Sequence, residues 1–225
     1  MPRINAGEGA PTSSRFGGRP ALQPGEVFPI CGACHTSMPL LVQLNLAEIP
    51  EAARAAIPAP LRTGLLQLFY CTNGDCNNDD FGAFTHNALA RVLAASTLPA
   101  LVFKDGPALS AARVTGWWPL QDLPDGDEAD IQGVKLTDKQ CHEYYETRYA
   151  EGKDVPIQGD KLLGWPDWIQ GVFYPSCPVC SGPMTYVLQV ASEDHIPFMF
   201  GDAGVGHVCV CPSHPGRASF YWSCC

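Results

Sequence analysis

The sequence predicts an α+β fold made predominantly of antiparallel β-sheet, in which two related halves are joined by a bridging helix. Three observations support this prediction. Residues 18–45 and 164–191 align without a gap at a constant offset of 146 residues. Glycine (22 residues) and proline (21 residues) are abundant, which favours dense turns over long helices. Each copy carries Cys-x-x-Cys and then a short apolar run that is typical of a strand.

The repeat defines the expected organisation of the chain. Its shared positions are Gly18/Gly164, Pro20/Pro166, Gly25/Gly171, Pro29/Pro175, Cys31/Cys177, Cys34/Cys180, Met38/Met184 and Gln43/Gln189. A second match, at an offset of 140, aligns residues 64–71 with 204–211 and pairs Cys71 with Cys211. We therefore expect a single domain over residues 1–225. It would comprise a first half at 16–98, a connector with a helix at 99–161 and a second half at 162–225.

The chain before residue 123 offers short elements in a clear order. Residues 1–15 are polar and are expected to be loosely ordered. An alanine-rich stretch at 50–57 begins with proline, which predicts a short helix. Apolar runs predict strands at 39–46, 64–71, 88–95 and 111–118, although 88–95 also fits a helix.

The connector between the halves is expected to hold the main helix. Residues 123–133 are acidic and contain proline and glycine, which predicts an irregular segment. Residues 137–149 predict a helix, because Thr137 can cap its start and Gln140 occupies the capping-box position. This helix would bridge the two halves.

The cysteines predict two structural zinc sites. A tetrahedral zinc ion takes four cysteine or histidine ligands, and paired turns joined by strands can supply them. The first half offers Cys31, Cys34, Cys71 and Cys76, and the second half offers Cys177, Cys180, Cys211 and His214. Cys209 is a reserve ligand, but the repeat aligns it with Phe69. Since four protein ligands leave no position for an activated water, both zinc ions are expected to be structural.

Other interpretations of the cysteines remain open. They could be buried free thiols, or the remains of a metal site that no longer binds. A thioredoxin-like redox pair is disfavoured, because that motif needs Cys-x-x-Cys at the start of a helix and both copies here lead into predicted strands.

Composition excludes several classes of partner. The net charge of −9 argues against binding to nucleic acid and suits a basic protein partner. The N-terminal segment lacks the apolar core of a secretory signal, and no apolar run reaches 18 residues, so we expect no export and no membrane span. The 11 cysteines are then expected in a reducing, cytoplasmic environment.

The sequence offers little that indicates catalysis. The glycine-rich stretch at 201–206 lacks the Lys-Ser/Thr ending of a phosphate-binding loop. Asp202, His207 and Cys209 are the residues that a small hydrolase or redox enzyme would use, and they remain an alternative. Trp165 and Trp168 either cap the sheet core or form an exposed peptide-binding patch.

Several short motifs together resemble a known family. They are KLLGWPDWIQ (161–170), CPVCSGPMTYVLQ (177–189), MFGDAGVG (199–206) and FYWSC (220–224), with further fits at 41–46, 64–71 and 116–124. These motifs cover most of the chain and resemble the YwqG-like family, a bacterial domain of unknown function. The Cys-x-x-Cys pair is also similar to an element of the eukaryotic programmed cell death protein 2 group, which is linked to ribosomal-protein handling.

The resemblance implies an antiparallel, internally duplicated, sheet-rich fold without an established enzymatic activity or a catalytic residue to carry over. Many family members lack the full cysteine set, so the zinc prediction rests on this sequence alone. We therefore expect a non-enzymatic, zinc-stabilised protein-binding module that handles a basic client, such as a nascent ribosomal protein. The alternatives are a toxin-neutralising, immunity-type protein and the small enzyme described above.

Overall fold

The computed structural model describes residues 1–225 except 77–81, 97–100, 143–145, 147–155 and 215. The largest sheet has six strands, in the order β1 (Pro2–Ala6), β8 (Ala112–Trp117), β2 (Arg15–Phe16), β4 (Leu40–Asn45), β5 (Leu65–Tyr70) and β6 (Ala88–Leu93). A second sheet has the order β12 (Ala218–Ser223), β11 (Val205–Val210), β10 (Thr185–Ala191) and β9 (Lys161–Leu162). A small sheet pairs β3 (Ala21–Leu22) with β7 (Val102–Phe103).

Helices are few and short in the described part of the chain. The labelled ones are α1 (Glu51–Arg54), a 3-10 turn η1 (Ala59–Leu61) and α2 (Gly126–Ile131), and residues 138–142 are also helical. All strand pairs within the sheets are antiparallel, which confirms the predicted α+β class dominated by antiparallel sheet. No helix in these residues is long and apolar enough to cross a membrane.

Most of the predicted elements of the first half are confirmed. The runs at 39–46, 64–71 and 111–118 correspond to β4, β5 and β8, and the alanine-rich stretch contains α1. The ambiguous segment at 88–95 is a strand, β6, because its backbone pairs residue by residue with β5.

The prediction of a loosely ordered N-terminal segment is wrong. Residues 2–6 form β1, an edge strand that pairs with β8. Arg15 lies in β2 and is fully buried. Its guanidinium group donates five hydrogen bonds to main-chain carbonyls, and these hold the preceding loop in place. The acceptors are the carbonyl oxygens of Glu8, Ala10, Pro11, Ser13 and Arg19.

The range predicted as a connector contributes more than a bridge. It contains β7 and β8, and its acidic part holds α2, which was predicted to be irregular. Asp125 caps α2 by accepting a hydrogen bond from the backbone N–H of Glu128. The predicted helix at 137–149 begins with the expected capping box between Thr137 and Gln140, and residues 138–142 are helical. Most of its remainder lies outside the described residues.

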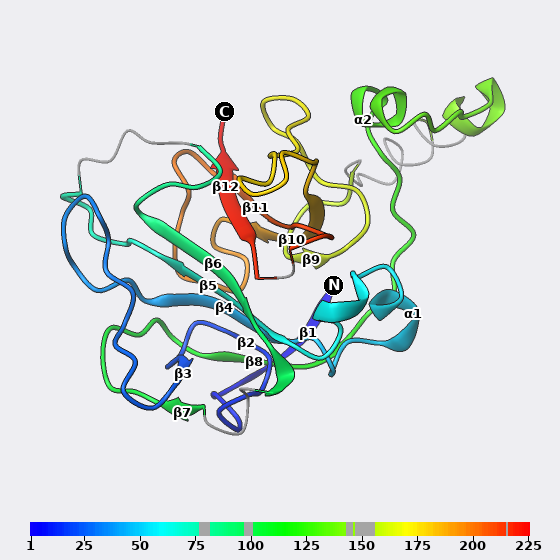
Figure 1. The fold of residues 1–225 in the computed structure, drawn as a ribbon. Coiled ribbons are helices and arrows are strands. Elements are labelled where there is room, and N and C mark those ends of the chain that lie inside the picture. The colour runs from blue at the N-terminus through cyan, green and yellow to red at the C-terminus, as the bar shows by residue number, and fades with distance from the viewer. Residues whose placement is uncertain (77–81, 97–100, 143–145, 147–155, 215) are drawn as a thin grey trace.

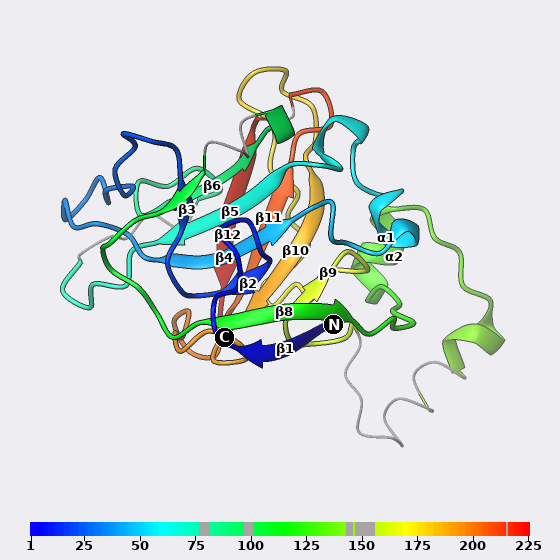
Figure 2. The same ribbon diagram turned by 90° about the horizontal axis from the view of Figure 1, so that it is seen from below.

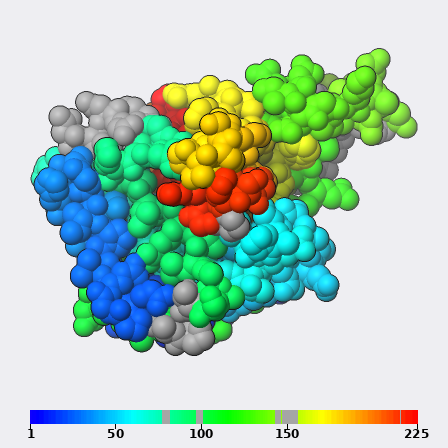
Figure 3. Space-filling model, in the orientation of Figure 1, coloured from blue at the N-terminus to red at the C-terminus, as the bar shows by residue number. Residues whose placement is uncertain are grey.

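Helix α2 is fixed to the second half by one buried carboxylate. Glu128 is fully buried, and it accepts hydrogen bonds from Trp168 Nε1 and Tyr174 Oη, both at 2.6 Å. Trp168 is therefore a core residue, as the first of the two interpretations of the tryptophan pair expected. The segment around α2 projects from the main body at the upper right of Figure 3.

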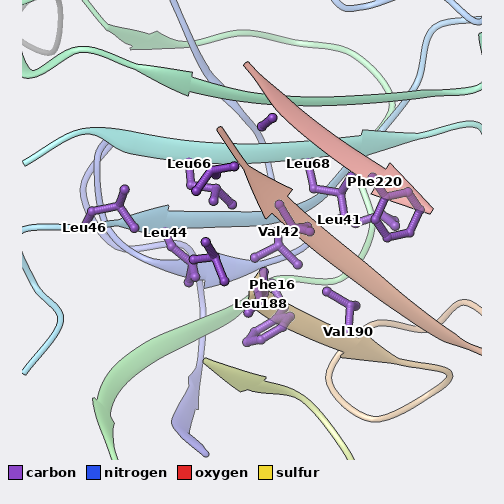
Figure 4. Close-up of a cluster of buried hydrophobic side chains, with 14 of the residues drawn as sticks. Phe16, Leu41, Val42, Leu44, Leu46, Leu66, Leu68, Leu188, Val190 and Phe220 are labelled. Carbon is purple, nitrogen blue, oxygen red and sulfur yellow. The ribbon is translucent and has the colours of Figure 1, made fainter. Parts of the chain in front are cut away.

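The two large sheets pack face to face with their strands crossing steeply, as Figure 2 shows. One continuous apolar cluster lies between them and takes residues from both sheets. Figure 4 shows ten of its members: Phe16, Leu41, Val42, Leu44, Leu46, Leu66, Leu68, Leu188, Val190 and Phe220. Since both halves contribute to a single core, neither half buries its apolar face alone.

The strands β2-β4-β5-β6 and β9-β10-β11-β12 show the same pairing pattern. Each central pair has a β-bulge at the same place, after Leu40 in β4 and after Tyr186 in β10. Two backbone hydrogen bonds of the first sheet have equivalents in the second. The bond from Gly17 N to Leu41 O corresponds to that from Leu163 N to Val187 O. The bond from Cys71 N to Asn87 O corresponds to that from Cys211 N to Arg217 O. The first sheet then adds β8 and β1 beyond β2, whereas the second sheet ends at β9.

The glutamine that both copies share has the same structural role in each. Gln43 Oε1 accepts from the backbone N–H of Ala21, and Gln189 Oε1 accepts from that of Asp167. Both amides also donate to a main-chain carbonyl of the loop before β2 or β9. Each buried glutamine thereby ties a loop to the middle of its sheet.

Candidate metal centres

The first cysteine cluster lies where the loop before β4 meets the end of β5. Cys31, Cys34, Cys71 and Cys76 place their sulfur atoms within 4.8 Å of one another. The Sγ atoms of Cys34 and Cys71 are 3.5 Å apart, and those of Cys31 and Cys76 are 3.8 Å apart. The four predicted ligands of the first half are thus brought together.

The second cluster lies at the equivalent place, between the loop before β10 and the end of β11. Cys177, Cys180, Cys211 and His214 form a group of the same size. The Sγ atoms of Cys180 and Cys211 are 3.7 Å apart, and His214 Nδ1 lies 3.5 Å from Cys211 Sγ. The structure therefore places His214 in this group, and the reserve residue Cys209 outside it.

These separations fit a tetrahedral zinc ion. With Zn–S near 2.3 Å and Zn–N near 2.0 Å, sulfur–sulfur edges of about 3.8 Å and sulfur–nitrogen edges of about 3.6 Å are expected. Three of the sulfur–sulfur distances are 3.5, 3.7 and 3.8 Å, and every pair of ligand atoms within a group lies within 4.8 Å. The two distances from His214 Nδ1 are 3.5 and 3.8 Å. Both donor sets are therefore compatible with zinc in composition and in spacing.

The turn that holds each pair of cysteines is built by backbone bonds. Isolated β-bridges close it, Ile30 with Ser37 in the first half and Ser176 with Pro183 in the second. His35 and Ser181 occupy the left-handed region, with φ of 58° and 57°, where the chain reverses. Both turns lead into strands, β4 and β10, so they lack the helix start that a thioredoxin-like pair requires.

One thiol in each cluster is held near its ionised form. A hydrogen bond from the Thr36 hydroxyl lowers the pKa of Cys34 to about 5. At Cys177 burial opposes ionisation, but the backbone N–H groups of Cys180 and Val179 lower the pKa to about 6. Burial and the neighbouring thiols raise the pKa of Cys71, Cys76 and Cys211. Without a cation, each cluster therefore favours one thiolate beside protonated thiols, whereas a bound zinc ion would take all of its cysteine ligands as thiolates.

The alternative enzyme residues do not assemble into a reactive site. Cys209 is fully buried, and burial raises the pKa of its thiol to about 12, which makes it a poor nucleophile. His207 is also fully buried, and burial lowers the pKa of its imidazole to about 3. Asp202 lies in an exposed turn before β11. Burial therefore favours the uncharged forms of both this thiol and this imidazole.

The structure reveals a third polar cluster that the sequence did not suggest. Asp160 is fully buried, and its Oδ2 lies 2.8 Å from His195 Nδ1, while Asp194 Oδ1 lies 3.3 Å from the same nitrogen. Asp160 also accepts from the backbone N–H of Ala191, as Ser14 does from that of Asn45 in the first half. Ser14 and Asp160 lie at the repeat offset of 146, and each accepts a hydrogen bond from the backbone of its neighbouring strand.

His195 is expected to make stability depend on pH. Hydrogen bonds to Asp160 and Asp194 raise its pKa from 6.5 to about 9. Its contribution, on the order of 2 kcal/mol, is therefore fully present below pH 6.5 and is lost as the pH rises through 9. Between these limits, the free energy of unfolding of wild type should fall relative to that of His195→Gln, as measured by urea denaturation.

The matched control is His142→Gln, which removes an exposed imidazole. Its pH profile should follow that of wild type. A His195→Gln profile parallel to wild type from pH 6.5 to 9 would show that the ion pair contributes nothing.

Comparison with known proteins gives two results. A family model described as a domain of unknown function, DUF1963, matches residues 14–221. The chain is also similar to the uncharacterized protein YpfL of Salmonella typhimurium strain LT2, at 31% identity over 67 residues. That match covers 30% of this chain and 16% of the relative, so it spans a small part of both. On the family match, which includes both cysteine clusters and all of β2 to β11, this chain belongs to the DUF1963 family of domains of unknown function.

Proposed function

We propose that each cluster holds one structural zinc ion and that the protein is a non-enzymatic, zinc-stabilised binding module. The observation that carries this proposal is the spacing of the two four-ligand groups, which matches a closed tetrahedral site in both halves. Each zinc ion would tie the loop before a central strand to the end of its neighbour. Ion binding would then stabilise the small apolar clusters beside each site.

The two zinc turns also present apolar side chains to solvent. Val27 is 73% exposed, and Phe173, its equivalent at an offset of 146, is 44% exposed. Ile30 and Val179 are 55% and 52% exposed. Rigid turns that display such residues suit contact with another protein, because little conformational freedom is lost on binding.

A basic protein is the partner that we propose. The net charge of −9 favours approach of a positively charged client and disfavours nucleic acid. A reducing cytoplasm would preserve the thiolates, and all eleven cysteines are free of disulfides in the structure.

The recurring contacts support the further proposal that the two halves are copies of one motif. We also propose that the chain is related to the YwqG-like family and, more distantly, to programmed cell death protein 2.

The binding proposal can be tested by quantitative affinity capture from a native extract. The bait variant Ile30→Asp/Val179→Asp changes both turns outside the ligand set. Ile131→Asp is the matched control, because Ile131 is 62% exposed and belongs to α2, outside the residues of both turns. We expect a basic protein that wild type and Ile131→Asp recover and that the double variant loses. Equal recovery of every captured protein by all three baits would contradict the proposal.

A further inference from the structure

A cavity of about 550 Å³ lies between the two halves, away from both cysteine clusters. Its walls come from three separate parts of the chain. Ala53 and Ala56 belong to the α1 region, Trp117 and Trp118 to the end of β8, and Leu162 and Leu163 to β9 and the residue after it. Figure 1 shows α1 and β9 on the same side of the molecule.

The cavity has a clear origin in the fold. In the six-stranded sheet, β8 pairs with the outer edge of β2. Among the described strands, β9 is the equivalent of β2, and the second sheet ends there. The space beside β9 is therefore bordered by side chains from α1 and from the end of β8 instead of by a paired strand.

The two charged side chains in the lining pair with each other. Lys161 Nζ lies 2.9 Å from Asp122 Oδ2, and the two side chains are 4% and 9% exposed. Asp122 also accepts hydrogen bonds from the backbone N–H groups of Ile157 and Trp165. This pair carries no net charge and its carboxylate is well bonded, so it offers no counter-charge to a charged ligand. The other charged group of the lining, the Met1 ammonium, donates a hydrogen bond to the Trp118 carbonyl oxygen.

The rest of the lining suits an apolar body. Alanine, leucine, proline and tryptophan side chains form most of the wall, and Trp118 and Leu120 are 59% and 46% exposed. The guanidinium of Arg3 lies 5.0 Å from the Trp118 ring centre and supports that ring from outside. A volume near 550 Å³ falls in the range of small-molecule sites, roughly 300–1,000 Å³.

We propose that this cavity is a binding site for a small, uncharged, largely apolar molecule. Such a ligand would fill the space beside β9 and cover Trp118 and Leu120. It would bury apolar wall without breaking the Lys161–Asp122 pair. This inference is independent of zinc, because none of the residues that line the cavity belongs to a cysteine cluster.

The probe for this site is N-phenyl-1-naphthylamine, an uncharged apolar fluorophore, used on the full chain as purified. We expect saturable binding at one site per chain, with energy transfer from tryptophan. The key variants are Ala56→Trp, which fills the cavity, and Ala55→Trp, which adds the same ring at the neighbouring exposed residue outside the lining. Ala56→Trp should weaken binding by at least about tenfold, and Ala55→Trp should leave it unchanged.

Two further measurements keep the test decisive. Trp118→Ala changes an exposed side chain and should be well folded, yet it should weaken binding and reduce energy transfer. The anionic probe 1-anilinonaphthalene-8-sulfonate should bind more weakly than the uncharged one. Non-saturable binding, equal affinity in folded Ala56→Trp and Ala55→Trp proteins, or preference for the anionic probe would overturn the proposal.

Discussion

Cys180→Ser is expected to remove one of two bound zinc ions and to lower the free energy of unfolding by at least about 3 kcal/mol. Cys180 is exposed, so serine fits in its place without loss of packing, and the cost reports the lost metal. Cys31→Ser should remove the other ion, with an added cost because Cys31 is fully buried. Because one core joins both sheets, each loss should destabilise the whole chain instead of unfolding one half.

The controls separate metal from side chain. Cys141→Ser lies outside both clusters and should retain two zinc ions and wild-type stability. After chelation, wild type and Cys180→Ser should unfold at the same urea concentration. A Cys180→Ser protein that retains two zinc ions, or that remains less stable than wild type after chelation, would contradict a ligand role.

Arg15→Met is expected to cost about 3–5 kcal/mol of stability, which is the second large effect. The substitution keeps the apolar stem but removes the donor of five hydrogen bonds, one of them buried and four part-buried, so these carbonyl oxygens lose that partner. Burial already lowers the pKa of Arg15 to about 10, which shows how strongly the site excludes water. Urea denaturation measures the loss.

Arg19→Met is the matched control on the same loop. Its guanidinium pairs with Glu8 at 3.2 Å, but its side chain is 47% exposed. Exposed ion pairs contribute about 0–1 kcal/mol, so this variant should be nearly as stable as wild type. Equal losses from the two substitutions would show that the five carbonyl contacts of Arg15 do not stabilise the loop.

The features that the sequence predicted well are local or repeated. Apolar runs identified β4, β5 and β8, since a strand with buried residues carries its pattern in consecutive positions. The offset between the copies then paired Cys71 with Cys211 and nominated His214 over Cys209. The structure brings together the same eight residues in two groups.

The features that it missed depend on contacts between distant segments. Strand β1 is short and mostly exposed, and it pairs with β8 more than a hundred residues later. Arg15 and Glu128 are buried charges, and a charged residue in a sequence normally indicates an exposed surface. Asp160 lies at the offset of 146 from Ser14, but the two residues differ, so the contact between Asp160 and His195 has no shared pattern in the sequence.

Zinc content combined with X-ray absorption of the untagged protein tests the central proposal most directly. One cluster offers four cysteines, and the other offers three cysteines and one histidine. We therefore expect about two zinc ions per chain, with an average coordination between four sulfurs and three sulfurs with one nitrogen. Zinc at well below one ion per chain, or coordination dominated by oxygen, would contradict the account.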